Sequence, residues 1–333
     1  SIYNGHPVYV DINQFFANHA AIFGNTGSGK SCGVARLVQN IFHNKNMIPY
    51  NANLFIFDAY GEYKTAFQNI NQINPYFSYK FITTNPTDPT DSKLQIPVHL
   101  LNLDDWSLFL QASNHSQIPI IERTLKLARI FAKNDDTRVF SECFEIDSNG
   151  NFGESVLITE YILKHIDDTL ETTPEPTDSF YTLVDFSKAM EFTLISEGFQ
   201  NNQQVYDDAM LLKVRLHSVI NSKIGTFFNY DKPITMDGYI SSLVAVSNNK
   251  KAQIININLE DVDDTYAKVI VKIIARFCFE FAKSRKERAS IPFNLFVEEA
   301  HRYIQKDTDT FLIGYNIFDR IAKEGRKYGV LLD

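Results

Sequence analysis

The sequence is poor in the residues that build metal centres and disulfide frameworks. It has three cysteines in 333 residues, and no two of them stand in C-x-x-C spacing. Its eight histidines show neither H-x₃-H nor H-E-x-x-H spacing. This pattern indicates neither a zinc site nor a disulfide scaffold, and we expect a reducing, cytoplasmic environment.

Long hydrophobic runs and an excess of basic residues are also missing. No run approaches the roughly 18 apolar residues of a membrane-spanning helix, and the first residues do not resemble a secretion signal. The formal net charge is −8. This charge argues against a uniformly basic nucleic-acid-binding surface, although a local basic channel formed in an oligomer stays open. The 44% hydrophobic content predicts a soluble globular chain with one large domain or two smaller ones.

The most informative stretch is a glycine-rich loop near the start of the sequence. Residues 24–31 match the phosphate-binding pattern G-x-x-x-x-G-K-[ST] at every required position. An apolar run at 20–23 predicts a short buried strand before the loop, and apolar residues at helical spacing follow it. We therefore predict an ATP site formed by Gly24, Asn25, Thr26, Gly27, Ser28, Gly29, Lys30, Ser31 and Cys32.

The residue types of this loop suit the binding of a phosphate. Gly24, Gly27 and Gly29 allow positive φ and leave room for backbone N–H groups around the anion. Lys30 is expected to bring a positive charge to the β and γ phosphates, and Ser31 to offer its hydroxyl to Mg²⁺. The helix that starts here directs its positive end at the same anion.

An acidic and aromatic element follows the next predicted strand. Residues 54–58 are apolar up to Asp58, and the letters DAYGEY occupy 58–63. Ligands of open parallel sheets lie beyond the carboxyl ends of the strands, so Asp58 and Glu62 are candidates for the nucleotide edge. The alternative is a structural loop with a helix N-cap.

A pair of acids closes a later apolar strand. Residues 294–297 lead directly into Glu298 and Glu299, which is the form of a Walker B element. Successive strand residues point in opposite directions, so the two carboxylates can have different roles. Glu298 is expected to hold the Mg²⁺ shell, and Glu299 to orient or deprotonate the attacking water. A buried strand that ends in two acids without nucleotide chemistry is the alternative.

A helical stretch separates two strand-rich parts of the chain. Residues 1–100 and 236–333 carry the motifs described above, and residues 101–235 have long helical patterns with few strand signals. We predict an α/β, RecA-like P-loop NTPase fold with a mostly parallel central sheet flanked by helices and a helical insertion at 101–235. The sequence stops where a strand at 330–332 has just begun, so we expect the second part of the core to be truncated.

Basic residues at helical spacing occur in the predicted insertion. They could face a polyanion, but a solvated helix face is the commoner reason for such spacing. These residues are Arg123, Lys126, Arg129, Lys213 and Arg215.

Together the motifs resemble the HerA-type ATPases of the HerA/FtsK superfamily of P-loop motors. The resemblance rests on residues 10–31, FDAYGEY at 57–63, FVEEAHRYI at 296–304 and IAKEGRKYG at 321–329. It implies a hexameric ring of identical subunits, in which a basic residue of the neighbouring subunit completes each ATP site.

Arg326 is the first choice for this residue, with Arg320 and Lys323 behind it. A basic helix C-terminus is the alternative reason for a positive charge here.

The sequence departs from the family pattern in three places. The N-terminal β-barrel module of the family is not visible, and the sequence stops before the polar sensor segment that usually follows GRKYG. Glu298 also stands where related motors usually have Asp. The longer side chain should still reach a metal-bound water.

The resemblance implies an ATP-driven helicase or translocase on double-stranded DNA that works with a nuclease or another effector protein. We expect no membrane among its partners. Such a motor contacts mainly the DNA backbone, so its affinity should fall steeply with salt. A second reading is an ATP-gated ring that assembles and regulates an effector enzyme in antiviral defence without translocation. The negative net charge of the chain suits this reading slightly better than a DNA motor. A conjugation or secretion ATPase of the same superfamily is the third reading and would need a membrane-associated partner.

Overall fold

The described residues of the computed structural model form two compact units. The first unit contains the described residues up to Leu94 and from Met236 onward, and the second contains those from Gln95 to Thr235. The three-part division of the chain into domains stays a proposal. The structure describes residues 11, 17–25, 27–43, 51–134, 179–196, 203–246, 250–304 and 316–333.

A six-stranded parallel sheet forms the centre of the first unit. Its strands are β1 (Asn53–Asp58), β2 (Tyr79–Thr83), β3 (Ser92–Lys93), β6 (Ile254–Asn258), β7 (Phe293–Val297) and β8 (Val330–Leu332). They lie in the order β3-β2-β6-β1-β7-β8, and each pairing is parallel. Every residue of β1 and β7 is buried, as expected for strands that are covered on both faces. A separate antiparallel ribbon pairs β4 (Ala245–Val246) with β5 (Lys250–Lys251).

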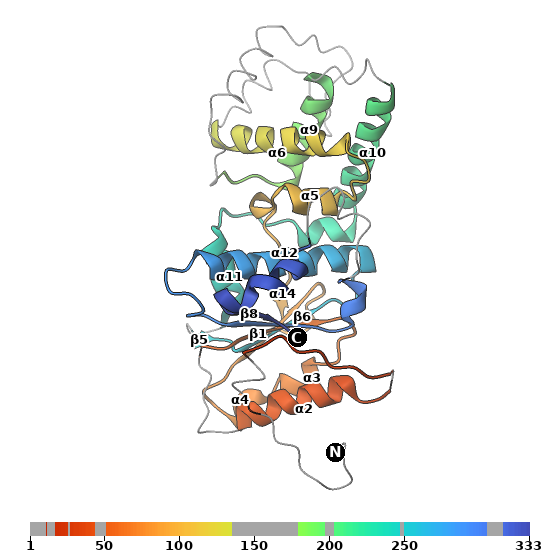
Figure 1. Ribbon diagram of the computed structural model, residues 1–333. Helices are drawn as coiled ribbons and strands as arrows, with labels where there is room; N and C mark the ends of the chain where they lie inside the picture. The colour runs from red at the N-terminus through yellow and green to blue at the C-terminus, as the bar shows by residue number, and fades with distance from the viewer. Residues whose placement is uncertain are drawn as a thin grey trace. The chain divides into compact units, whose positions relative to one another are not determined.

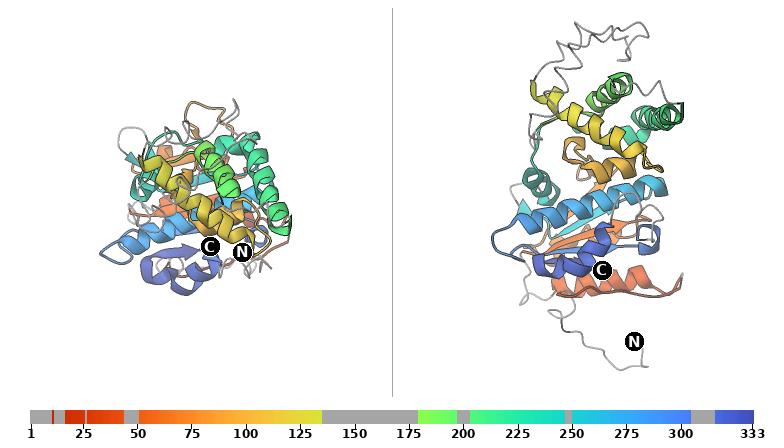
Figure 2. Two further views of the ribbon diagram at one scale, coloured as in Figure 1. Left: turned by 90° about the horizontal axis from the view of Figure 1, so that it is seen from above. Right: turned by 45° about the horizontal axis from the view of Figure 1, so that its top comes forward.

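Helices cover both faces of this sheet (Figure 1). One face carries α2 (Lys30–His43), α3 (Lys64–Phe67) and α4 (Ile70–Ile73). The other face carries α11 (Met236–Val244), α12 (Asp264–Ser284) and α14 (Ile317–Tyr328). The right-hand view of Figure 2 shows α2 and α12 on opposite sides of the strands. The predicted α/β fold with a parallel sheet flanked by helices is therefore confirmed.

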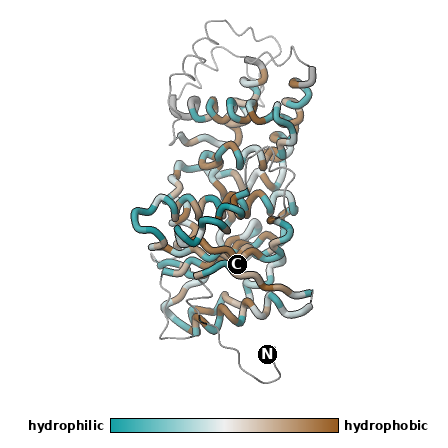
Figure 3. Tube along the Cα trace, in the orientation of Figure 1, coloured by the Kyte–Doolittle hydropathy of each residue, from teal (hydrophilic) through white to brown (hydrophobic). Residues whose placement is uncertain are grey.

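The core under α2 fixes the helix that begins at the phosphate loop. Val38 and Phe42 of α2 share one buried cluster with Ile56 of β1 and Phe67 of α3. Phe42 also packs edge to face on Phe77, with ring centroids 4.6 Å apart. Figure 3 shows hydrophobic residues gathered along the strands of the sheet. Each such side chain contributes about 1.5–3 kcal/mol when it is fully buried, so α2 has a stable base.

The second unit is helical. It contains α5 (Leu103–Phe109), α6 (Gln117–Asn134), α9 (Leu183–Ser196) and α10 (Gln203–Ile220), with the 3₁₀ turns η1 (Val98–Leu100) and η3 (Lys223–Phe227). Trp106 stacks on Phe186 at 3.6 Å between ring centroids, and its Nε1 donates to the hydroxyl of Tyr181. These elements agree with the helical pattern of the sequence. No helix in the described ranges is long and apolar enough to cross a membrane.

Two of the basic residues considered for a polyanion have partners inside the second unit. Lys213 Nζ lies 2.6 Å from Glu191 Oε1. Arg215 donates to the carbonyl oxygens of Leu110 and Gln111. These contacts favour a structural role for both side chains.

The segment before the phosphate loop differs from its prediction. The sequence predicts a buried strand at 20–23, but these residues form no strand, and Phe23 is 92% exposed. A backbone hydrogen bond of 3.2 Å from Ala20 N to Leu332 O ties the segment to β8. β8 is the edge strand of the sheet, and one hydrogen bond does not make a ladder.

Candidate functional site

The phosphate loop needs glycine at two of its three glycine positions because of backbone conformation. Gly27 and Gly29 have φ of +78° and +84°, where a residue with a Cβ is strained. A Cβ at either position would meet nothing within 4 Å, so crowding is not the reason. Gly24 is not among the residues with positive φ, which corrects that expectation. Thr26 lies outside the described residues.

Lys30 bridges the mouth of the loop. Its Nζ donates to Gly24 O at 2.8 Å and also lies 3.5 Å from Asn25 O. The loop closes through a bond of 3.0 Å from Ser28 N to Asn25 O. Because α2 begins at Lys30, its unpaired N-terminal N–H groups lie beside the loop, where the helix dipole favours an anion.

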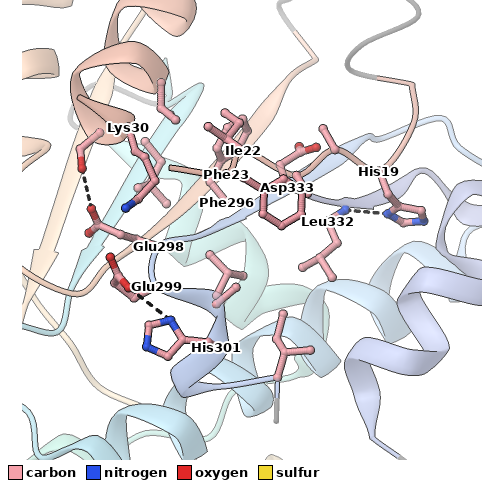
Figure 4. Close-up of a pocket in the computed structure, with 18 of the residues that line it drawn as sticks. His19, Ile22, Phe23, Lys30, Phe296, Glu298, Glu299, His301, Leu332 and Asp333 are labelled. Carbon is pink, nitrogen blue, oxygen red and sulfur yellow. Dashed lines mark hydrogen bonds and ion pairs between the residues drawn. The ribbon is translucent and has the colours of Figure 1, made fainter. Parts of the chain in front are cut away.

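Ser31 joins the phosphate loop to the end of β7. Its Oγ donates to Oε1 of Glu298 at 3.1 Å, although 267 positions separate the two residues (Figure 4). The other oxygen of Glu298 accepts from Ala59 N at 3.1 Å. A hydroxyl and a carboxylate therefore lie side by side at the carboxyl ends of β1 and β7. Cys32, the next residue of α2, is exposed.

Asp58 organises the loop after β1. It is fully buried, and its carboxylate accepts from Glu62 N and Tyr63 N, both at 3.0 Å, and from Asn256 Nδ2 at 3.2 Å. Glu62 is exposed. Between the two readings of Asp58, these bonds favour the structural one. The loop that Asp58 holds presents Ala59 N to Glu298.

The carboxylate of Glu298 lies in an environment that disfavours its charge. Burial, and next the negative charge of Asp58, raise its pKa to about 7, against the hydrogen bonds from Ser31 and Ala59. Tyr63 also lines the cavity, and burial together with the Glu298 charge raises the pKa of its phenol. A positive charge near Glu298, such as a metal ion, would favour the ionised carboxylate.

Glu299 departs from the expected strand geometry. β7 ends at Val297, so strand alternation does not set the direction of either acid. Glu298 N still donates to Phe57 O at 3.3 Å, whereas Glu299 has φ 50° and ψ 46°. Glu299 thus begins the 3₁₀ turn η5 (Ala300–Arg302), and its Oε2 lies 3.2 Å from Nδ1 of His301.

A cavity of about 520 Å³ brings these residues together. Gly24, Lys30 and Ser31 line it from the phosphate loop, and Glu298 and Glu299 line it from the end of β7. Much of the remaining wall is apolar, as is usual for ligand sites, in which a few well-placed polar groups of the protein orient the ligand. Its further lining residues include His19, Phe23, Val34, Tyr63, Phe296 and His301.

Arg326 lies in the last turn of α14 and is exposed. Burial lowers the pKa of His19, which lines the cavity, and the positive charge of Arg326 lowers it further. Arg326 is therefore within electrostatic reach of the cavity. Of the two other candidates, Arg320 faces Glu324 at 3.8 Å and the Phe279 ring at 5.0 Å, and Lys323 is exposed.

The donors present fit a magnesium ion better than a caged metal. In the part of the chain that the structure describes, no three His, Cys, Asp or Glu side chains cluster as metal ligands. Mg²⁺ is typically held by one or two protein oxygens, with water and phosphate oxygens as its other ligands. Ser31 and Glu298 supply such a pair.

The lining residues that were absent from the sequence-based site include Tyr63, His301 and His19. Tyr63 ends the DAYGEY element, in which Asp58 and Glu62 were the predicted site residues. His301 lies within FVEEAHRYI, two residues after Glu299. This closeness in sequence to the acid pair could have indicated that His301 belongs to the site. His19 reaches the cavity through its bond with Leu332 N, 313 positions away, which no local pattern indicates.

Comparison with known proteins agrees with this arrangement. Residues 2–278 match the family described as the central domain of the helicase HerA. The chain is 24% identical over 324 residues to the DNA double-strand break repair helicase HerA of Sulfolobus acidocaldarius, covering 94% of this chain and 50% of the relative. The same protein of Saccharolobus solfataricus is 24% identical over 330 residues, covering 97% and 51%. The chain thus spans about half the length of the curated relatives it matches.

A solved structure shows the same fold. VirB4 of Thermoanaerobacter pseudethanolicus superposes with a TM-score of 0.56 at 14% identity, covering 99% of this chain and 73% of that one. The family match thus covers most of the sequence, and it agrees with the phosphate loop, the acid pair and the order of the strands. The chain belongs to the HerA central-domain family.

Proposed function

We propose that this chain is the ATP-hydrolysing core of a hexameric motor that translocates on double-stranded DNA. The observation that carries the proposal is the bond of 3.1 Å between Ser31 Oγ and Glu298 Oε1. It joins the phosphate loop to the acid pair in the way that phosphoryl transfer to water requires. A nuclease or another effector protein is the expected partner.

Each residue of the site then has a role in hydrolysis. Lys30 would exchange its carbonyl contacts for the phosphates of ATP, and Ser31 and Glu298 would hold Mg²⁺. The bound ion would neutralise charge on the phosphate oxygens. Glu299 accepts a proton from the attacking water as the water oxygen bonds to the terminal phosphorus and the bond to ADP breaks. Arg326 of a neighbouring subunit adds positive charge at the same point.

The DNA part of the proposal is supported by the names of the two relatives, both DNA double-strand break repair helicases. Because the chain spans about half of each relative, their activity comes to it as a proposal. The DNA would pass through a channel that forms in the assembled ring, since the net charge of a single chain is −8.

An ATP-gated scaffold for an effector enzyme in antiviral defence is the second candidate. The internal contacts of Lys213 and Arg215 favour it, because they occupy two charges that could have faced a polyanion. In this case ATP would switch the assembly without movement along DNA.

Hydrolysis with and without long double-stranded DNA separates the two candidates. The motor predicts a rate that rises with DNA, and a rise that shrinks as salt is increased. A rate that does not respond to DNA at low salt would contradict the motor and favour the scaffold.

A further inference from the structure

His301 contacts the proposed catalytic base directly. Its Nδ1 lies 3.2 Å from Oε2 of Glu299. Both residues line the cavity that contains Lys30 and Ser31. Figure 4 shows the Glu299 carboxylate between the imidazole of His301 on one side and Glu298 on the other.

The backbone holds this pair in place. Glu299 has φ 50° and ψ 46°, which a residue with a Cβ adopts only when its surroundings impose it. Its carbonyl accepts from Arg302 N at 2.8 Å, and Ala300 O accepts from Ile304 N at 2.8 Å. The turn of η5 therefore sets the separation between the acid and the imidazole two residues later.

The contact occupies Oε2 of the Glu299 carboxylate and leaves Oε1 available for the attacking water. A general base that a third group orients is a recurring arrangement in enzymes that activate a hydroxyl or a water. We infer that His301 is a positioning residue, whose ring N–H holds Oε2 of Glu299 so that Oε1 receives the proton of the attacking water. This inference rests on the proposed function of Glu299.

His301 can be replaced without loss of core packing, because its side chain is 72% exposed. His301→Ala should lower kcat for ATP about tenfold, as loss of an orienting partner typically does, and leave KM unchanged. His301→Asn should recover most of the rate, since its amide reaches the place of Nδ1. His115→Ala, at an exposed position of the second unit, is the matched control.

Two results of this series would overturn the inference. An unchanged kcat in His301→Ala would mean that the contact does nothing, and a raised kcat would mean that it restrains Glu299. A further check is His301→Ala in a Glu299→Gln background, which should cause no additional loss because the two residues act as a unit.

A second readout does not depend on hydrolysis. If His301 donates from Nδ1 to Glu299, the neutral ring carries its proton on Nδ1, which ¹⁵N NMR detects. Glu299→Ala should move the proton to Nε2, and His301→Asn identifies the signal. The same tautomer in the wild type and in Glu299→Ala would contradict the proposed hydrogen bond from Nδ1 to Glu299. Hydrolysis that does not require Glu299 would instead overturn the proposed function.

Discussion

Glu298 is a carboxylate whose charge the fold disfavours. Burial and the nearby charge of Asp58 raise its pKa from 4.5 to about 7. Between these two values the folded chain keeps a proton that the unfolded chain has lost. The contribution of Glu298 to stability is thus fully present below about pH 4.5 and is lost as pH rises through about 7.

Glu298→Gln should remove this part of the pH dependence. We expect the free energy of unfolding of the wild-type protein to fall more between pH 5 and pH 8 than that of the variant, as measured by urea denaturation. Asp333, whose pKa is also raised to about 7, contributes equally to the pH dependence of both proteins. Glu324→Gln, at an exposed position of α14, should keep the wild-type slope. Equal slopes for wild type and Glu298→Gln would contradict this account of the site.

At the scale of elements, two helical glycines have opposite surroundings. A Cβ at Gly325 of α14 would lie 2.2 Å from Val330 O, so the helix approaches β8 too closely for any side chain. A Cβ at Gly33 of α2 would meet nothing within 4 Å. Glycine is therefore required by packing in EGRKYG but not in the first turns of α2.

The two alanine variants should change stability in opposite directions. Gly33→Ala should stabilise the fold by about 1 kcal/mol, because alanine is the better helix former. Gly325→Ala should destabilise it by about 1–3 kcal/mol, because α14 must shift away from β8. Urea denaturation of both variants provides the measurement. A stabilising Gly325→Ala would show that α14 does not pack on β8 as described.

The same elements show what the sequence could predict. Apolar runs ending in acids predicted β1 and β7, and helical spacing predicted α2, because burial imposes these patterns locally. The sequence did not predict that the apolar run at 20–23 would lie beside an edge strand with one backbone bond to it, since composition does not reveal which strand lies alongside.

Contacts between distant residues were equally out of reach. Asp58 was open to two readings until its bonds to Glu62 N, Tyr63 N and Asn256 were known. The motif types predicted that Ser31 and Glu298 belong to one site, but the bond between them depends on the strand order. The αL backbone of Glu299 has no signature in the sequence.

At the scale of the whole molecule, the proposed ring makes each site depend on a neighbour. Arg326 is exposed on α14, and no side-chain hydrogen bond or ion pair holds it among the described residues. Its charge reaches His19 at the cavity rim. An exposed arginine at the edge of a site is suited to act on a second subunit.

Mixing two inactive variants tests this dependence. Arg326→Ala and Glu299→Gln should each hydrolyse ATP poorly alone. Mixed in equal amounts and reassembled, they should recover roughly a quarter of the wild-type rate, because random mixing in a symmetric ring gives that share of complete sites. A mixture no more active than its components would contradict a role of Arg326 in the neighbouring site.

The central claim is that Glu299 serves the chemical step of ATP hydrolysis. We would measure ATP binding and hydrolysis on the same preparations of the wild type and Glu299→Gln, with Glu287→Gln as an exposed control. We predict that Glu299→Gln binds Mg·ATP like the wild type and hydrolyses it at least about a hundredfold more slowly. Hydrolysis by Glu299→Gln at the wild-type rate would contradict it.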